Sequence, residues 1–202
     1  MKKILCLAAL LVFNHKAFSQ FNTIKMIRKL PEIQVDSVHL VEDKEIYSAV
    51  IESGAFNNLE NFASPLISMP VSQPLINSAY GNRIDPLTGK VKFHAGIDFK
   101  GSSDSVMAIM LGQVKKVAYS RGLGNYIEIA HGDFRTTYGH LLFVLVAENT
   151  KVDAGTVIGI TGSTGKSTGD HLHFGLKYKG KVINPAPFLD LIYRTLELKA
   201  RK

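Results

Sequence analysis

Cysteine is almost absent from this sequence of 202 residues, since the single cysteine is Cys6. Cys6 lies in an apolar stretch at the N-terminus, so the remainder of the chain carries no thiol. A disulfide bond and a thiol nucleophile are both excluded there, because each requires cysteine. Stability must therefore come from packing, and any bound metal must be held by His, Asp or Glu.

The sequence also lacks a long apolar run. The run at the N-terminus, Ile4–Phe13, covers 10 residues, whereas a transmembrane helix needs about 20. Lys2 and Lys3 precede this run, and small residues follow it at the spacing of a cleavage site. We therefore expect residues 1–19 to be a secretory signal peptide cleaved before Gln20. The mature chain is expected to have no membrane span and to act in the periplasm, the cell envelope or the exterior.

Positive charge is moderate and scattered. The formal net charge is +7, and removal of Lys2, Lys3 and Lys16 with the signal peptide lowers it by three to +4. No run of basic residues is interleaved with aromatic residues, as a nucleic-acid-binding stripe would be, so no nucleic-acid partner is expected. An excess of this size also suits an anionic polymer of the cell envelope.

The pattern of the chain changes near Leu75. Residues 20–74 are poorly periodic and interrupted by proline, so we interpret them as an N-terminal extension or linker. Residues 75–190 contain short β-like runs separated by glycine and Asn/Asp turns, which predicts an antiparallel β-sandwich or barrel-like domain. Apolar spacing predicts a short C-terminal helix over residues 188–200. In the predicted domain organisation, the C-terminal helical tail comprises residues 191–202. The fold class is therefore mainly β.

Histidine occurs in three short strings within the β-rich part, namely FHAGIDF (93–99), TYGHL (137–141) and DHLHF (170–174). Side chains at i and i+2 of a strand point to one face, so His171 and His173 are expected to lie side by side. His94 and Asp98 share a face if the segment between them stays extended, although Gly96 also permits a turn. Imidazole nitrogen and carboxylate oxygen are suitable zinc ligands, which makes a catalytic zinc site a natural hypothesis.

Three longer strings carry a resemblance to a known family: SAYGNRIDPLTGKVKFHAGIDFKG, GNYIEIAHGDFRTTYGHL and GITGSTGKSTGDHLHFGL. In order and spacing, residues 75–189 closely resemble the lysostaphin-type (LytM-like) zinc metallopeptidases. The resemblance implies a compact β-sandwich of the duplicated-hybrid-motif type with a groove across one sheet. It also implies hydrolysis of peptide bonds in bacterial peptidoglycan, with Zn²⁺ as cofactor and peptidoglycan as partner.

The resemblance also implies individual roles. The H-x-x-x-D match makes His94 and Asp98 zinc ligands, and the second histidine of H-x-H makes His173 the third. His140 and His171 then become the catalytic histidines, one as proton acceptor and one as stabiliser of the oxyanion, in an order that stays open. The helical pattern H-E-x-x-H, whose glutamate serves as base in other zinc proteases, is absent from the sequence.

The resemblance leaves alternatives open. Some members of the family have lost ligands and activate other cell-wall hydrolases without being enzymes, and a secreted toxin or a protease with other targets would use the same site. All five site positions are intact here, which favours an active endopeptidase. The bond that is cut, the protein partners, the oligomeric state and the role of residues 20–74 are not predicted.

Overall fold

The computed structural model describes residues 66–85 and 88–200. The predicted signal peptide and most of the predicted N-terminal extension lie outside these residues. Within the described part of the chain, no helix has the length and apolar character needed to cross a membrane.

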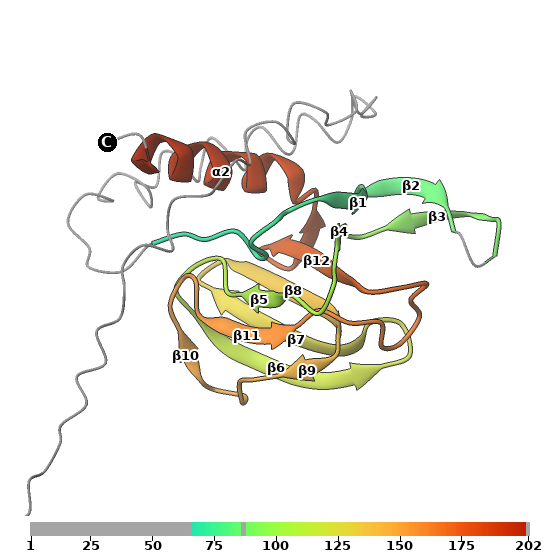
Figure 1. The fold of residues 1–202 in the computed structure, drawn as a ribbon, viewed down its shortest axis with the longest axis horizontal. Coiled ribbons are helices and arrows are strands. Elements are labelled where there is room, and N and C mark those ends of the chain that lie inside the picture. The colour runs from blue at the N-terminus through green and yellow to red at the C-terminus, as the bar shows by residue number, and fades with distance from the viewer. Residues whose placement is uncertain (1–65, 86–87, 201–202) are drawn as a thin grey trace, which may run out of the picture. The chain divides into compact units, whose positions relative to one another are not determined.

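Antiparallel strands form three sheets (Figure 1). The large sheet has the order β1-β4-β12-β8-β7-β6-β10, with β13 paired to β12. Its strands are β1 (Ile76–Ser78), β4 (Ile97–Lys100), β6 (Gly112–Ser120), β7 (Gly124–His131), β8 (Phe134–Leu141), β10 (Lys151–Val152), β12 (His171–Tyr178) and β13 (Lys181–Ile183). The second sheet contains β5 (Ser105–Met107), β11 (Val157–Ile160) and β9 (Phe143–Val144), and the third is the hairpin of β2 (Gly81–Ile84) and β3 (Val91–His94).

The core lies between the large sheet and the three-stranded sheet. Figure 1 shows the three-stranded sheet across one face of the large sheet. Val106 and Ile158 from the smaller sheet belong to the same buried cluster as Ile127 and Ile129 from β7. Apolar residues fill this space because alternate side chains of each strand point to the same face. The prediction of a mainly β, antiparallel domain is confirmed.

Helix α2 (Ala186–Ala200) follows the last strand and packs its apolar side on the core. The side chain of Asn184 accepts a hydrogen bond from the backbone N–H of Ala186 at 3.0 Å, as a residue that caps a helix N-terminus does. The helix therefore begins two residues before the expected Phe188, and Pro187 is tolerated because the first turn does not need its N–H. Phe188 and Ile192 are fully buried.

The segment before Leu75 also contributes to the core. Ile67 and Val71 are 3% and 1% exposed, and Ile67 pairs with Met110 in an isolated β-bridge. The end of the predicted extension thus packs on the β domain, while the boundary at Leu75 itself stays a prediction.

Candidate metal centre

His94 and Asp98 reach the site from two different sheets. β3 ends at His94 and pairs with β2, whereas β4 begins at Ile97 and joins the large sheet. The chain therefore changes sheets at Ala95 and Gly96. The sequence left open an extended segment or a turn between His94 and Asp98, and the structure has the turn. His94 and Asp98 are both buried.

β12 supplies the neighbouring histidines. Leu172 and Phe174 point into the core with no exposed surface, and His171 and His173 point to the opposite face, where both line one groove. The pairing of β12 with β4 places His173 directly opposite Asp98. The expected common face of the H-x-H pair is therefore present.

Three possible ligand atoms converge between these strands. His94 Nε2 lies 3.0 Å from Asp98 Oδ1, His173 Nδ1 lies 2.9 Å from the same oxygen, and the two nitrogens are 3.1 Å apart. Ligands about 2.0–2.2 Å from a tetrahedral zinc ion lie roughly 3.3–3.6 Å from one another. The triangle is nearly equilateral and a few tenths of an ångström smaller than this, so a small expansion would admit the ion.

The hydrogen bonding of His94 explains why this cluster suits a cation. Its Nδ1 lies 2.8 Å from the carbonyl oxygen of Ala79. A carbonyl only accepts, so Nδ1 carries a hydrogen, and in the neutral form of the ring the lone pair of Nε2 would point toward Asp98. A lone pair facing a carboxylate oxygen at 3.0 Å is unfavourable unless a cation lies between them or the ring is protonated.

The local environment sets the protonation states that metal binding requires. Burial raises the pKa of Asp98, but hydrogen bonding and charge interactions with His173 and His94 together outweigh burial and hold its pKa far below the usual range. Burial lowers the pKa of His173, against the opposing effect of Asp98. Near neutral pH the site therefore presents a carboxylate and a neutral imidazole, the forms in which these groups bind metal.

His140 reaches the same groove through a break in strand alternation. Tyr138 and Leu141 are both fully buried in the core, although residues three apart on a regular strand point to opposite faces. His140 between them has a φ of 61°, a left-handed conformation that is uncommon for a residue with a side chain. This conformation turns its imidazole out of the core and into the groove, where its ring centroid lies 4.5 Å from that of His171.

Backbone carbonyls fix the tautomers of both non-ligand histidines. His140 Nδ1 donates to Thr164 O at 2.8 Å, and His171 Nδ1 donates to Gly169 O at 2.8 Å. When neutral, each ring therefore carries its free lone pair on Nε2. Burial lowers the pKa of His140 to about 4, so this imidazole is neutral at physiological pH and is able to accept a proton.

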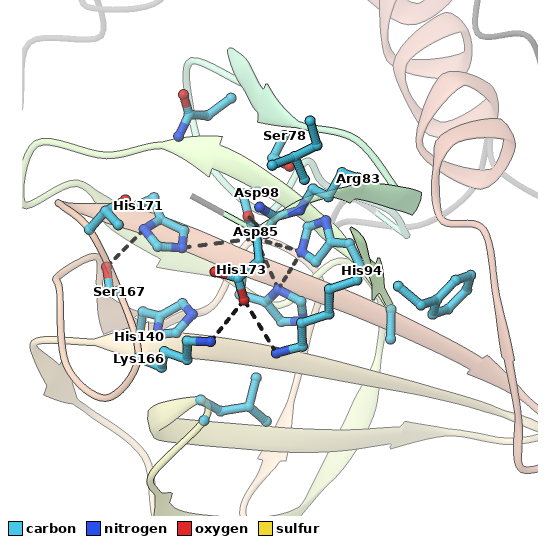
Figure 2. A pocket seen from close by; sticks show the side chains of 18 residues that line it. Ser78, Arg83, Asp85, His94, Asp98, His140, Lys166, Ser167, His171 and His173 are labelled. Atoms are coloured by element: carbon cyan, nitrogen blue, oxygen red, sulfur yellow. Dashed lines mark hydrogen bonds and ion pairs between the residues drawn. The ribbon is translucent and has the colours of Figure 1, made fainter. Parts of the chain in front are cut away.

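The five predicted site residues line a groove of about 630 Å³. Figure 2 shows His94, Asp98, His140, His171 and His173 directed toward one another between the strands. One wall is the β2–β3 hairpin, and the other includes residues 166–168 of the loop before β12. The loop between β11 and β12 thus borders the groove.

The structure also brings Arg83, a residue without a predicted role, to the site. Arg83 Nη2 lies 3.4 Å from Asp98 Oδ2, the carboxylate oxygen that faces away from the two histidines. In the sequence, Arg83 is marked only by its place inside the string SAYGNRIDPLTG. Its neighbours in the chain do not indicate a contact with Asp98, which is 15 residues away. Arg83 balances the negative charge of Asp98 and restrains the rotation of the carboxylate.

His131 lies elsewhere and serves a different purpose. Its Nδ1 contacts Leu111 O and its Nε2 contacts Thr136 Oγ1, both at 2.9 Å. It is not among the described residues that line the groove. These contacts connect β7 with β8 and with the loop before β6.

Gly96 provides a test of how closely the site is packed. A Cβ atom at this position would lie 2.6 Å from both the Cε1 atom of His173 and the carbonyl oxygen of Phe174. The backbone oxygen cannot yield, so we expect Gly96→Ala to displace the imidazole and to weaken zinc binding by about 10- to 100-fold, as loss of a supporting contact does. Competition with a chelator measures this. Gly122→Ala is the control, because a Cβ there meets nothing within 4 Å, and wild-type affinity in Gly96→Ala would contradict the prediction.

Comparison with known proteins connects this geometry to a family. The sequence profile of Peptidase family M23 matches residues 92–185, the segment that contains all five predicted site residues. The catalytic domain of the antimicrobial peptidase lysostaphin from Staphylococcus simulans is similar over 58% of this chain and 92% of that domain, with 33% identity and a TM-score of 0.52. The chain belongs to peptidase family M23. The resemblance inferred from the sequence is confirmed.

Two other M23-like proteins widen the comparison. A zinc-containing peptidase from Vibrio cholerae has 32% identity and a TM-score of 0.52, over 57% of this chain and 37% of that one. The DD-carboxypeptidase/endopeptidase Mpg of Neisseria meningitidis is 35% identical over 136 residues, which are 66% of this chain and 29% of that protein. This M23 chain thus spans about a third of the length of the curated relatives it matches.

Proposed function

We propose that this M23 chain is a zinc metalloendopeptidase that hydrolyses peptide bonds in the stems or cross-links of bacterial peptidoglycan. The observation that carries the proposal is the convergence of His94, Asp98 and His173 within 2.9–3.1 Å beside two further histidines. Three protein ligands leave the fourth position of a tetrahedral zinc ion for water or substrate, which is the arrangement of a catalytic site. A relative from Vibrio cholerae that is 36% identical over 118 residues, the peptidoglycan DD-endopeptidase ShyC, supports peptidoglycan as the substrate.

The proposed roles divide between metal and histidines. Bound zinc supplies Lewis acidity, which polarises the scissile carbonyl and lowers the pKa of a water molecule. His140 and His171 then accept and donate the proton, because the Nδ1 of each ring is held by a backbone carbonyl and its Nε2 is left for the groove. The imidazole that takes the proton from water becomes a cation, and the N–H of a protonated imidazole is able to donate to the oxyanion or to the leaving amine.

The groove residues also hold these groups in position. The carbonyl groups of Thr164 and Gly169 orient His140 and His171, so neither ring must rotate before it accepts a proton. Arg83 restrains Asp98 from the side away from the proposed metal. Orientation of this kind lowers the entropic part of the activation barrier.

The proposed substrate lies outside the cytoplasmic membrane. The proposal therefore includes export directed by residues 1–19, which carry the features of a signal peptide. The mature protein would then act in the periplasm or cell envelope.

Incubation with purified sacculi tests the proposed function. The zinc-loaded protein is expected to release soluble muropeptides, and a chelator is expected to stop release until zinc is restored. Mass spectrometry of the fragments identifies the bond that is cut. Absence of release, or release unaffected by the chelator, would contradict the proposal, and stimulation of a separate hydrolase without release would favour the non-enzymatic alternative.

A further inference from the structure

A buried carboxylate joins the two walls of the groove. Asp85, just after β2, lies 2.8 Å from the ammonium of Lys166 in the opposite loop, 81 residues away in the sequence. Lys92 on β3 lies 3.9 Å from the same oxygen, Oδ2. Figure 2 shows Asp85 and Lys166 meeting at the groove. The two walls are therefore linked by an ion pair beside the proposed metal site.

Asp85 is a fixed anion. Its side chain is 8% exposed, and its other oxygen, Oδ1, accepts a hydrogen bond from the backbone N–H of Thr88 at 3.2 Å. Its own N–H donates to the carbonyl oxygen of Lys90 at 2.8 Å, which holds the hairpin turn. The position of the ammonium groups is consequently set by a carboxylate that the fold itself holds in place.

The lysines are more accessible than their partner. The side chains of Lys166 and Lys92 are 38% and 62% exposed, and both residues line the groove. An ammonium has three donor hydrogens, and one contact with Asp85 leaves donors for another acceptor. The backbone N–H of Lys166 donates to Gly122 O at 3.2 Å, which restrains the loop at this residue.

The charges of the groove favour an anionic ligand. Among the described residues that line it, three side chains are cationic and two are carboxylates, namely Arg83, Lys92, Lys166, Asp85 and Asp98. A divalent metal on Asp98 would make the groove more positive still. A site lined by cations attracts anionic substrates and raises their association rate.

We propose that Lys166, supported by Lys92, binds a free carboxylate of the substrate peptide beside the scissile bond and thereby selects anionic stem peptides over uncharged glycine bridges. This inference rests on the proposed endopeptidase function and concerns substrate selection within the same groove. Asp85 acts as a positioning residue, because it holds Lys166 over the groove until the substrate carboxylate arrives.

Paired substrates provide the test. Two synthetic cross-linked peptides are prepared that differ in one respect: the carboxylates flanking the scissile bond are free in one and converted to carboxamides in the other. The zinc-loaded full chain is expected to have a KM about tenfold lower for the free carboxylate, the effect of about one charge-assisted hydrogen bond. In Lys166→Met this preference is expected to fall to about twofold or less.

Two further variants separate recognition from loss of folding. Lys166→Arg keeps the charge and is expected to retain most of the preference. Lys179→Met is the matched control, since Lys179 pairs with Asp133 on an exposed surface and is not among the described groove residues. Circular dichroism establishes that all variants are folded.

The outcomes distinguish this inference from the proposed function. Cleavage of both peptides with equal KM, or an unchanged preference in Lys166→Met, would overturn carboxylate recognition while leaving the endopeptidase intact. Cleavage of neither peptide would mean that the proposed function has failed. Calorimetric titration of the same two peptides then decides the inference, because equal Kd values would overturn it and tighter, Lys166-dependent binding of the free carboxylate would support it.

Discussion

Replacing His173 by alanine is expected to abolish zinc binding and peptidoglycan hydrolysis together. The substitution removes one of three converging ligand atoms and leaves His94 and Asp98, which do not complete the site. Loss of a supporting contact alone weakens metal binding by about 10- to 100-fold, so loss of a ligand is expected to exceed this. Hydrolysis should fall by at least about 10³-fold, since Lewis-acid stabilisation is worth several kcal/mol.

Two measurements check this result: the zinc content after dialysis, determined by mass spectrometry, and the rate of muropeptide release. The control is His131→Ala, which removes a half-buried imidazole with partners at Leu111 and Thr136, away from the groove. It is expected to cost about 1–3 kcal/mol of stability, because hydrogen-bonding groups lose their partner, and to retain one equivalent of zinc. A His173→Ala protein that binds zinc with wild-type affinity would refute the ligand assignment.

Replacing His140 or His171 by alanine is expected to lower kcat by about 10²–10⁴-fold while zinc stays bound. Neither ring is part of the ligand triangle, but in the neutral form each ring would present an Nε2 lone pair to the groove, because a backbone carbonyl holds its Nδ1–H. Loss of a general base or of an oxyanion donor produces effects of this size. The low pKa of His140, about 4, means that it is unprotonated across the neutral range and is ready to accept a proton.

The double variant provides the sharper measurement. If the two histidines act on one proton and one oxyanion, His140→Ala/His171→Ala should lose little more than the worse single variant, because residues that act as a unit are not additive. Steady-state kinetics on one soluble cross-linked peptide, together with zinc analysis, measures this. Wild-type kcat in either single variant would exclude that residue from the proposed mechanism, whereas loss of zinc would move it into the metal site.

Some parts of the site follow directly from strand periodicity. The alternation of β12 alone predicts that His171 and His173 share a face, since Leu172 and Phe174 must face the core. The same rule misleads at β8, where it would place His140 on the same face as the buried Tyr138. The left-handed backbone at His140 breaks the alternation, and no local residue preference announces this conformation.

The contacts across the groove could not be predicted from the sequence. The contact between Arg83 and Asp98 and the ion pair between Asp85 and Lys166 each join segments that are adjacent only after the hairpin and the loop have docked. Surface charges in a sequence are common, and most are solvated rather than paired. Asp85 is buried, as Asp98 is, and this burial is a property of the folded hairpin.

The sequence by itself determined the chemistry of this protein. Since the single cysteine lies at position 6, within the predicted signal peptide, only histidine and carboxylate ligands are expected in the mature chain, and the strings around His94, Asp98 and His173 indicate the family. The tertiary structure decided the geometry, because His94 and His173 are 79 residues apart and meet only through the turn at Gly96 and the pairing of β12 with β4. Ligand types are local properties of a chain, whereas distances between ligands depend on sheet register, which the packing of the whole core sets.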